Sequence, residues 1–133
     1  MHSGALGWVG FVSFGALYCL VPWLWDRRLY SLKLVNWHFW VATLGIVLYI
    51  SAMWVSGILQ GLMWRAYTSL GFLEYSFIES VEAMHPFYII RAAGGALFVI
   101  GALIMAFNLW MTVRVGEEES GATLGHAALQ PAE

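Results

Sequence analysis

Hydrophobic residues run through this chain in three long blocks that are separated by more polar segments. The stretch 36–61 contains no Lys, Arg, Asp or Glu, and as a helix rising about 1.5 Å per residue it would extend for roughly 39 Å. That length crosses a hydrocarbon core of about 30 Å with some tilt. Similar apolar blocks occupy residues 4–25 and 87–113. The pattern predicts an all-α integral membrane protein with three transmembrane helices.

The composition favours the same class. Of the 133 residues, 61% are hydrophobic and only 11% are charged, and the mean hydropathy of +0.73 is that of a membrane protein rather than a soluble one. Nothing in the sequence indicates nucleic-acid binding, so no nucleic-acid partner is expected. The single Cys19 lies inside an apolar block, which excludes a disulfide framework within the chain.

Positive charge is concentrated on one side of the predicted spans. Four basic residues lie in the segment 26–35 or directly after the third block: Arg27, Arg28, Lys33 and Arg114. The longer segment 62–86 is net acidic, with three glutamates against one arginine: Glu74, Glu79, Glu82 and Arg65. Short basic segments stay in the cytoplasm. We therefore expect the segment 26–35 and the C-terminus inside, and the loop 62–86 outside.

Small residues predict where helices approach closely. The second block offers Gly45 and Ala52, and the third offers a face that includes Gly94, Gly95 and Gly101. Such faces let neighbouring backbones pack against each other in membranes. The first block carries its own glycine face, suited to packing against a helix or a flat cofactor: Gly4, Gly7, Gly10 and Gly15.

The remaining segments are predicted to lie outside the bilayer. In the outer loop, residues 67–84 place apolar and acidic residues at spacings of three and four, which predicts a short amphipathic surface helix. Pro86 would then stand in the first turn of the third span. After residue 113 the chain gains Gly, Glu and Ser, so residues 114–133 are predicted to form a disordered cytoplasmic tail.

Three stretches of the chain carry a resemblance to a known family. They are VNWHFWVATLGIVLYISAMWVSGILQGLMWRA, FIESVEAMHPFYIIRAAGG and GALIMAFNLWMTVR. Together they resemble the C-terminal region of the catalytic subunit of cbb3-type cytochrome c oxidases, in the haem-copper oxidase superfamily. The resemblance implies the last three helices of a twelve-helix bundle in the bacterial inner (plasma) membrane. The implied partners are the remaining helices of that subunit, other oxidase subunits, c-type cytochrome subunits and the lipid bilayer.

The same resemblance implies a cofactor role for His2. In the family, a His-x-His pair supplies ligands to two haems, and the HSGALGW sequence places His2 as the second of them, an axial ligand of the low-spin haem b iron. Imidazole suits this role because one neutral ring nitrogen binds iron while the other can be oriented by a hydrogen bond. The first histidine of the pair would precede Met1. The alternative is a solvated histidine near a chain terminus.

Arg91 is the second candidate site residue. It falls about one turn inside the third span, where a cation is costly unless it reaches water or meets an anion. A haem propionate is one such anion, because Arg binds carboxylates with two parallel hydrogen bonds. An ion pair with Glu79 or Glu82 of the preceding loop is the alternative. Arg65 has the same two interpretations.

The other histidines have simpler interpretations. His38, beside Trp37 and Trp40, is predicted to be an interfacial residue of an aromatic belt. His85 before Pro86 is predicted to cap a loop, with a haem propionate or a partner as alternatives, and His126 is predicted to be solvated. No two histidines have the spacing of a metal pair on one helix, and copper is not expected to bind.

The leading hypothesis is therefore a part of an oxidase catalytic subunit that contributes to haem b binding. The family couples electron transfer from cytochrome c to oxygen with proton pumping, but this chain has neither the copper ligands nor the high-spin haem ligand, so we expect no catalysis by the chain alone. Two alternatives remain: a non-catalytic membrane scaffold or assembly subunit, and a small cytochrome b-type anchor that would use His2 and His85.

Overall fold

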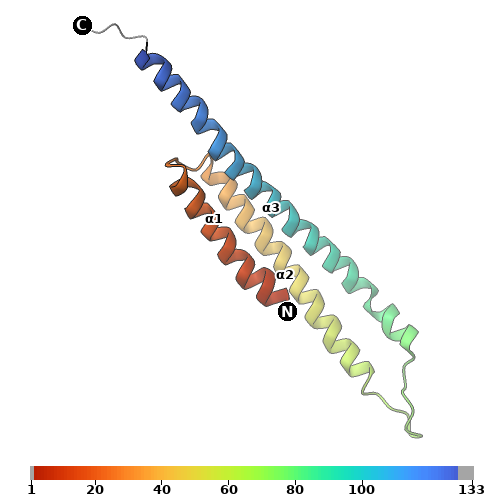
Figure 1. Cartoon of the computed structure of the whole chain (residues 1–133). Coiled ribbons are helices and arrows are strands. Elements are labelled where there is room, and N and C mark those ends of the chain that lie inside the picture. The colour runs from red at the N-terminus through yellow and green to blue at the C-terminus, as the bar shows by residue number, and fades with distance from the viewer. Residues whose placement is uncertain (1, 129–133) are drawn as a thin grey trace.

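The computed structural model describes residues 2–128, with side chains described as far as Val115. The elements in chain order are η1 (Ser3–Gly10), α1 (Phe11–Leu24), α2 (Leu32–Met63) and α3 (Phe77–Ala128). The π-helix η1 runs into α1 without a break, because the residues at their junction, Gly10 and Phe11, both have right-handed helical dihedrals. Figure 1 shows α2 and α3 packed side by side along most of their length, with η1 and α1 beside them.

Three helices in the described part of the chain are long and apolar enough to cross a membrane: Ser3–Leu24, Leu32–Met63 and Phe77–Val115. The predicted all-α fold with three apolar spans is therefore confirmed. α2 alone has 32 residues and extends for about 48 Å, which exceeds a hydrocarbon core of about 30 Å. His2, which precedes η1, lies beside Tyr49 near the middle of this long helix.

The prediction of a separate surface helix before the third span is wrong. After α2 the chain forms an irregular loop, in which Tyr67 and Leu73 form an isolated antiparallel bridge and Gly71 takes a positive φ of 82°. α3 then begins at Phe77 and includes Pro86 in its interior. Pro86 has no backbone N–H, so the carbonyl one turn earlier loses its hydrogen-bond partner. Membrane helices tolerate this loss because neighbouring side chains, ordered water or a local change in helix geometry can satisfy the carbonyl.

A capping box explains the early start of α3. The Ser76 hydroxyl accepts a hydrogen bond from the Glu79 backbone N–H at 3.3 Å, and the Glu79 carboxylate accepts one from the Ser76 backbone N–H at 2.7 Å. The S-x-x-E pattern satisfies two amides that would otherwise lack partners at the helix start. Glu79 is therefore a capping residue of α3.

The far end of α3 also differs from expectation. The sequence predicts disorder from residue 114, whereas the backbone is helical to Ala128. Extending an existing helix fixes one residue for each hydrogen bond gained, so it does not repeat the cost of nucleation. Residues 129–133 of the predicted tail lie outside the described residues.

Close contact between glycines holds α2 against α3. A Cβ on Gly45 would lie 2.7 Å from the Gly94 carbonyl oxygen, and a Cβ on Gly94 would lie 2.7 Å from the Gly45 carbonyl oxygen. Further along, a Cβ on Gly101 would lie 3.0 Å from the Ala42 Cβ. The prediction that small residues of these two spans allow close packing is confirmed, and the structure shows that the two faces pack against each other. The glycine face of the first span differs, because a Cβ on Gly4, Gly7 or Gly15 would meet no atom within 4 Å in the described chain.

Hydrogen bonds hold the short connection between α1 and α2 against α3. Asn108, which is fully buried, accepts a hydrogen bond from the Ser31 backbone N–H at 3.1 Å and donates one to the Ser31 carbonyl at 3.0 Å. Thr112 accepts a hydrogen bond from the Tyr30 backbone N–H at 3.0 Å, and Arg27 donates to the Val113 carbonyl. We call these contacts the α3 clamp. They position the start of α2, where Ser31 is the N-cap.

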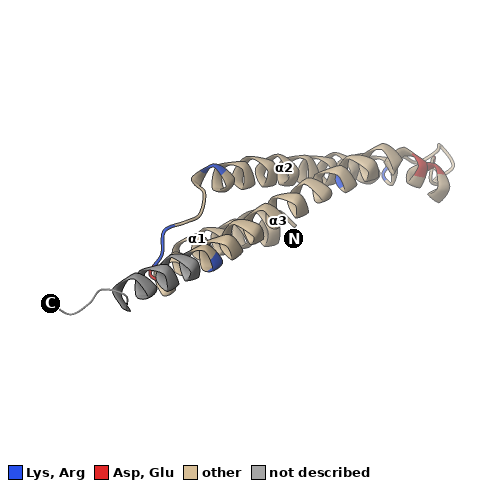
Figure 2. Cartoon of the chain, turned by 90° about the horizontal axis from the view of Figure 1, so that it is seen from above, with Lys and Arg blue, Asp and Glu red and all other residues tan. Residues whose placement is uncertain are grey.

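Most basic and most acidic residues with described side chains lie toward opposite ends of the bundle, although Asp26 lies at the basic end and Arg65 in the loop at the acidic end. Figure 2 shows the acidic residues of the α2–α3 loop and the start of α3 at one end, and basic residues of the α1–α2 connection at the opposite end. This separation is the one on which the predicted membrane orientation depends. The orientation itself, with a cytoplasmic C-terminus, stays a prediction.

Candidate cofactor site

His2 lies at the start of η1 and rests against the second span. Its ring centroid is 5.2 Å from that of Tyr49 on α2, with the planes inclined at 44°. The side chain is exposed, so the ring is held on one side and open on the other. A histidine in this position can offer a ring nitrogen to an external metal.

Arg91 lies in α3 and is half-buried. Its Nη1 donates to the Met53 sulfur at 3.7 Å, and its guanidinium carbon lies 5.2 Å from the centroid of the Tyr88 ring. Neither of the expected alternatives, an ion pair with Glu79 or with Glu82, is formed in the described chain. Both carboxylates lie on α3 at least nine residues before Arg91, which is roughly 14 Å or more along the helix axis. Within the part of the chain that the structure describes, the guanidinium is held by a sulfur and an aromatic face rather than by a carboxylate.

The fold places His2 and Arg91 against neighbouring turns of α2. His2 contacts Tyr49, and Arg91 contacts Met53. Tyr49 and Met53 are one helical turn apart, a rise of about 6 Å along α2. His2 and Arg91 are far apart in the sequence, so only the packing of η1 and α3 against α2 places them at adjacent turns of that helix.

The structure places His85 away from His2. His85 lies inside α3, where its Nδ1 and the Val81 carbonyl are 3.3 Å apart and its ring centroid is 6.0 Å from that of Tyr88. The predicted loop-capping role is therefore wrong. Gly94 packs beside Tyr49, and His85 lies roughly 14 Å before Gly94 along the helix axis. The two histidines are thus at different depths in the bundle.

His38 is also not the interfacial residue that the sequence predicts. It is buried, with 3% of its surface exposed, and its Nδ1 lies 3.1 Å from the Tyr18 hydroxyl of α1. The Phe14 ring lies edge-on to it at 5.0 Å, and its Nε2 is buried with no hydrogen-bond partner in the described chain. The neighbouring tryptophans point outward, whereas His38 falls on the face of α2 that packs against α1.

Sequence reasoning did not identify the α3 clamp or the Tyr18–His38 contact. The available signal was an Asn and a Thr within an apolar span, because membrane interiors offer such groups no partner except protein or trapped water. Within the described residues, no three His, Cys, Asp or Glu side chains come together as a metal-ion site.

These features define a helical segment of an integral membrane protein. Its two candidate site residues, His2 and Arg91, contact adjacent turns of the long helix α2. Residues 1–97 match the family model of cytochrome c and quinol oxidase polypeptide I. The chain belongs to this family, the haem-copper oxidase subunit I proteins.

The relatives are close. The chain is 87% identical over 134 residues to a cytochrome c oxidase subunit 1 homolog, bacteroid, of Bradyrhizobium diazoefficiens, a match that covers 100% of this chain and 24% of that protein. It is 69% identical to a cytochrome c oxidase subunit 1 homolog of Azorhizobium caulinodans, over 100% of this chain and 24% of that protein. It is 56% identical to the cbb3-type cytochrome c oxidase subunit CcoN1 of Stutzerimonas stutzeri, over 88% of this chain and 25% of that protein. The chain thus spans about a quarter of the length of these relatives.

Proposed function

We propose that the chain forms the C-terminal three-helix part of the catalytic subunit of a cbb3-type cytochrome c oxidase in a bacterial inner membrane. The identity of 87% across the whole chain to a cytochrome c oxidase subunit 1 homolog supports this proposal, as does the similarity to a cbb3-type subunit. In the complete enzyme, this part contributes to haem b binding during electron transfer from cytochrome c to oxygen with proton pumping. The other helices of a twelve-helix bundle, the remaining oxidase subunits and the c-type cytochrome subunits complete the complex.

The residues of the chain fit a haem in three respects. His2 presents an exposed imidazole whose ring is supported on one side by Tyr49. Gly4 and Gly7 leave part of η1 without side chains, and no described atom lies within 4 Å of where their Cβ atoms would be. Arg91 supplies a cation held by Met53 and Tyr88. These residues would provide a ligand for the iron, a surface that a flat ring can approach and a partner for a carboxylate.

Each of these residues has a defined task in the proposal. When bound, haem b supplies a reversible one-electron couple at its iron. His2 would offer a ring nitrogen to the iron, and Tyr49 would limit the rotation of that ring. Arg91 would pair with a propionate, and charge-assisted hydrogen bonds would hold that edge of the cofactor. We assign no copper ligand to this chain.

The observation that carries the proposal is the convergence of His2 and Arg91 on successive turns of α2. A small cytochrome b-type anchor would instead need His2 and His85 on opposite sides of one iron. His85 lies roughly 14 Å along α3 from Gly94, which packs beside the Tyr49 that His2 contacts, so the two histidines lie at different depths and this alternative is disfavoured. A scaffold subunit would use the glycine contacts between α2 and α3 and would not require an exposed histidine beside a cation.

The test is a reduced-minus-oxidised visible spectrum of the membrane complex purified through this chain. We expect His2→Ala to remove the low-spin b-type signal, while the matched control His85→Ala leaves it unchanged. Retention of the full signal in His2→Ala would reject His2 as the ligand. A wild-type complex without haem would favour the scaffold.

A further inference from the structure

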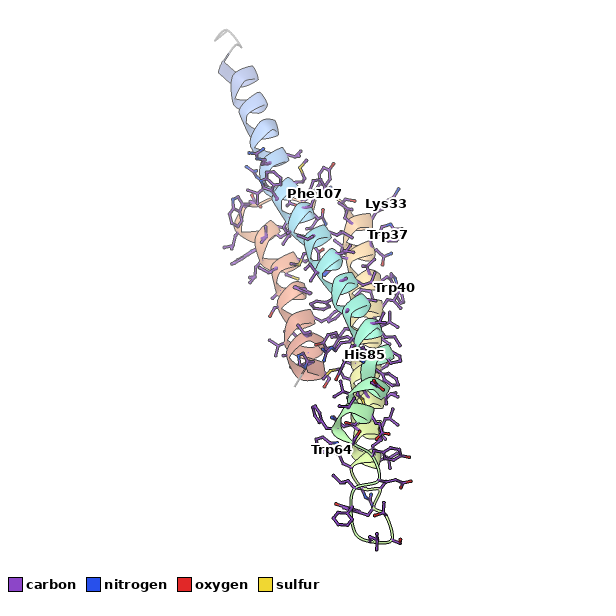
Figure 3. The ribbon with its side chains drawn as sticks, turned by 90° about the vertical axis from the view of Figure 1, so that its right-hand side faces the viewer. Lys33, Trp37, Trp40, Trp64, His85 and Phe107 are labelled. Atoms are coloured by element: carbon purple, nitrogen blue, oxygen red, sulfur yellow. The ribbon has the colours of Figure 1, made fainter. Side chains whose placement is uncertain are left out.

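An open groove lies along the N-terminal part of α2. It has a volume of about 390 Å³ and is lined by Lys33, Asn36, Trp37 and Trp40. Figure 3 shows Lys33, Trp37 and Trp40 along one edge of α2, pointing away from the other two helices. The groove is separate from the candidate cofactor site, which lies further along α2 at Tyr49 and Met53.

Helical geometry explains why these residues share a face. Residues three, four and seven positions after Lys33 lie on the same side of a helix, and they are the other members of the groove. The residues that pack against α1 and α3, such as His38 and Ala42, lie on the opposite side and are buried. As a result, Trp37 and Trp40 remain 65% and 63% exposed. The three-helix unit thus leaves two indoles and a cation uncovered together.

The chemistry of this face matches one type of ligand. Lys33 is a cation in the first turn of α2, where it adds to the positive end of the helix dipole. An anion is therefore favoured there, and the nearby basic connection with Arg27 and Arg28 strengthens the same field (Figure 2). Asn36 adds an amide that can donate a hydrogen bond, and the indoles offer apolar surface suited to the boundary between headgroups and acyl chains.

We propose that this groove binds an anionic phospholipid. The lipid phosphate pairs with Lys33 and accepts a hydrogen bond from Asn36, and an acyl chain lies against Trp37 and Trp40. The protein thereby gains a fixed lipid at the basic end of the bundle. This site does not depend on haem binding or on the oxidase activity.

The same helix provides a matched control. A second groove on α2, about 490 Å³ in volume, is lined by Met53, Trp54, Gly57 and Ile58 and has no charged residue in its lining. It offers an indole and apolar surface without a cation. If apolar contact alone retained lipids, both grooves would bind zwitterionic and anionic lipids alike.

Native mass spectrometry of the detergent-purified protein tests the proposal. The protein is titrated with phosphatidylglycerol or with phosphatidylcholine of the same acyl chains. We expect phosphatidylglycerol to bind more tightly to the wild type, and Lys33→Gln to weaken that binding about fivefold, as expected for one basic residue near a lipid surface. Trp37→Leu should also weaken it, whereas Trp54→Leu should not. Circular dichroism confirms that each variant keeps its helix content.

Three outcomes would overturn the proposal. One is equal affinity for the two lipids, which would indicate apolar adsorption. Another is unchanged phosphatidylglycerol binding in both Lys33→Gln and Trp37→Leu. The third is a wild-type complex that binds no phosphatidylglycerol because another polypeptide covers this face.

Discussion

Gly45 of α2 and Gly94 of α3 lie back to back, so that a Cβ on either residue would come within 2.7 Å of the other's carbonyl oxygen. Real Cβ atoms do not approach backbone atoms this closely, and the neighbouring atoms are backbone that cannot rotate away. The pair therefore fixes the smallest distance between the two longest helices. Because Tyr49 and Gly94 are in contact at this crossing, it also determines how α3 presents Arg91 to α2.

Gly45→Ala should destabilise the bundle. The added methyl group forces the helices apart at their closest point, and overpacking of this kind costs about 1–3 kcal/mol. Gly57→Ala is the matched control on the same helix, since a Cβ there would meet nothing within 4 Å. Thermal unfolding in detergent, followed by circular dichroism, measures both variants. Equal melting temperatures for the two would show that the glycine contact does not limit the packing.

Asn108→Leu should release the connection between α1 and α2. The substitution removes both hydrogen bonds to Ser31, and each backbone group left unsatisfied in a buried position costs about 1–3 kcal/mol. Amide hydrogen exchange should become faster at Ser31, which loses its acceptor. The control is Asn36→Leu, whose exposed amide is not part of the α3 clamp. Unchanged protection at Ser31 would contradict the clamp.

Tyr18→Phe should destabilise the chain through His38. Loss of the hydroxyl leaves both ring nitrogens of the buried His38 without a partner, at a cost of about 1 kcal/mol for an interhelical hydrogen bond in a membrane protein. In a His38→Leu background the same substitution should be nearly neutral. A double-mutant cycle of unfolding free energies measures this coupling. Tyr30→Phe, at an exposed side chain, is the control, and a coupling near zero would reject the interaction.

Arg91→Gln should lower the midpoint potential of the low-spin haem that we propose. A cation beside a propionate favours the reduced state, which carries one more negative charge, so its removal shifts the potential downward, by tens of millivolts on Coulombic grounds. Spectroelectrochemical titration of the purified complex measures the shift. Arg91→Lys should restore most of the potential, and Arg65→Gln on the exposed loop should leave it unchanged. A potential that does not move in Arg91→Gln would reject the propionate contact.

Local patterns in the sequence were enough to predict the three apolar helices and the small residues between α2 and α3. Helix bounds were predicted less well, because the Ser76–Glu79 capping box starts α3 before Pro86. That pattern was present in the sequence, but the acidic residues around it suggested a surface helix. His2 was identified through the family resemblance, and Arg91 through the cost of a cation inside an apolar span. The cofactor roles of both residues stay predictions.

By itself, then, the sequence determined that this protein is a set of membrane helices, because hydrophobicity and helix period are properties of neighbouring residues. Only the tertiary structure decided which polar residues meet. It buried His38 against Tyr18 and joined Ser31 to Asn108 by hydrogen bonds. It also placed His2 and Arg91 against residues on successive turns of α2, Tyr49 and Met53. These contacts join segments that are distant in the chain, and they depend on the rotation and depth of each helix, which close packing sets and no local pattern encodes.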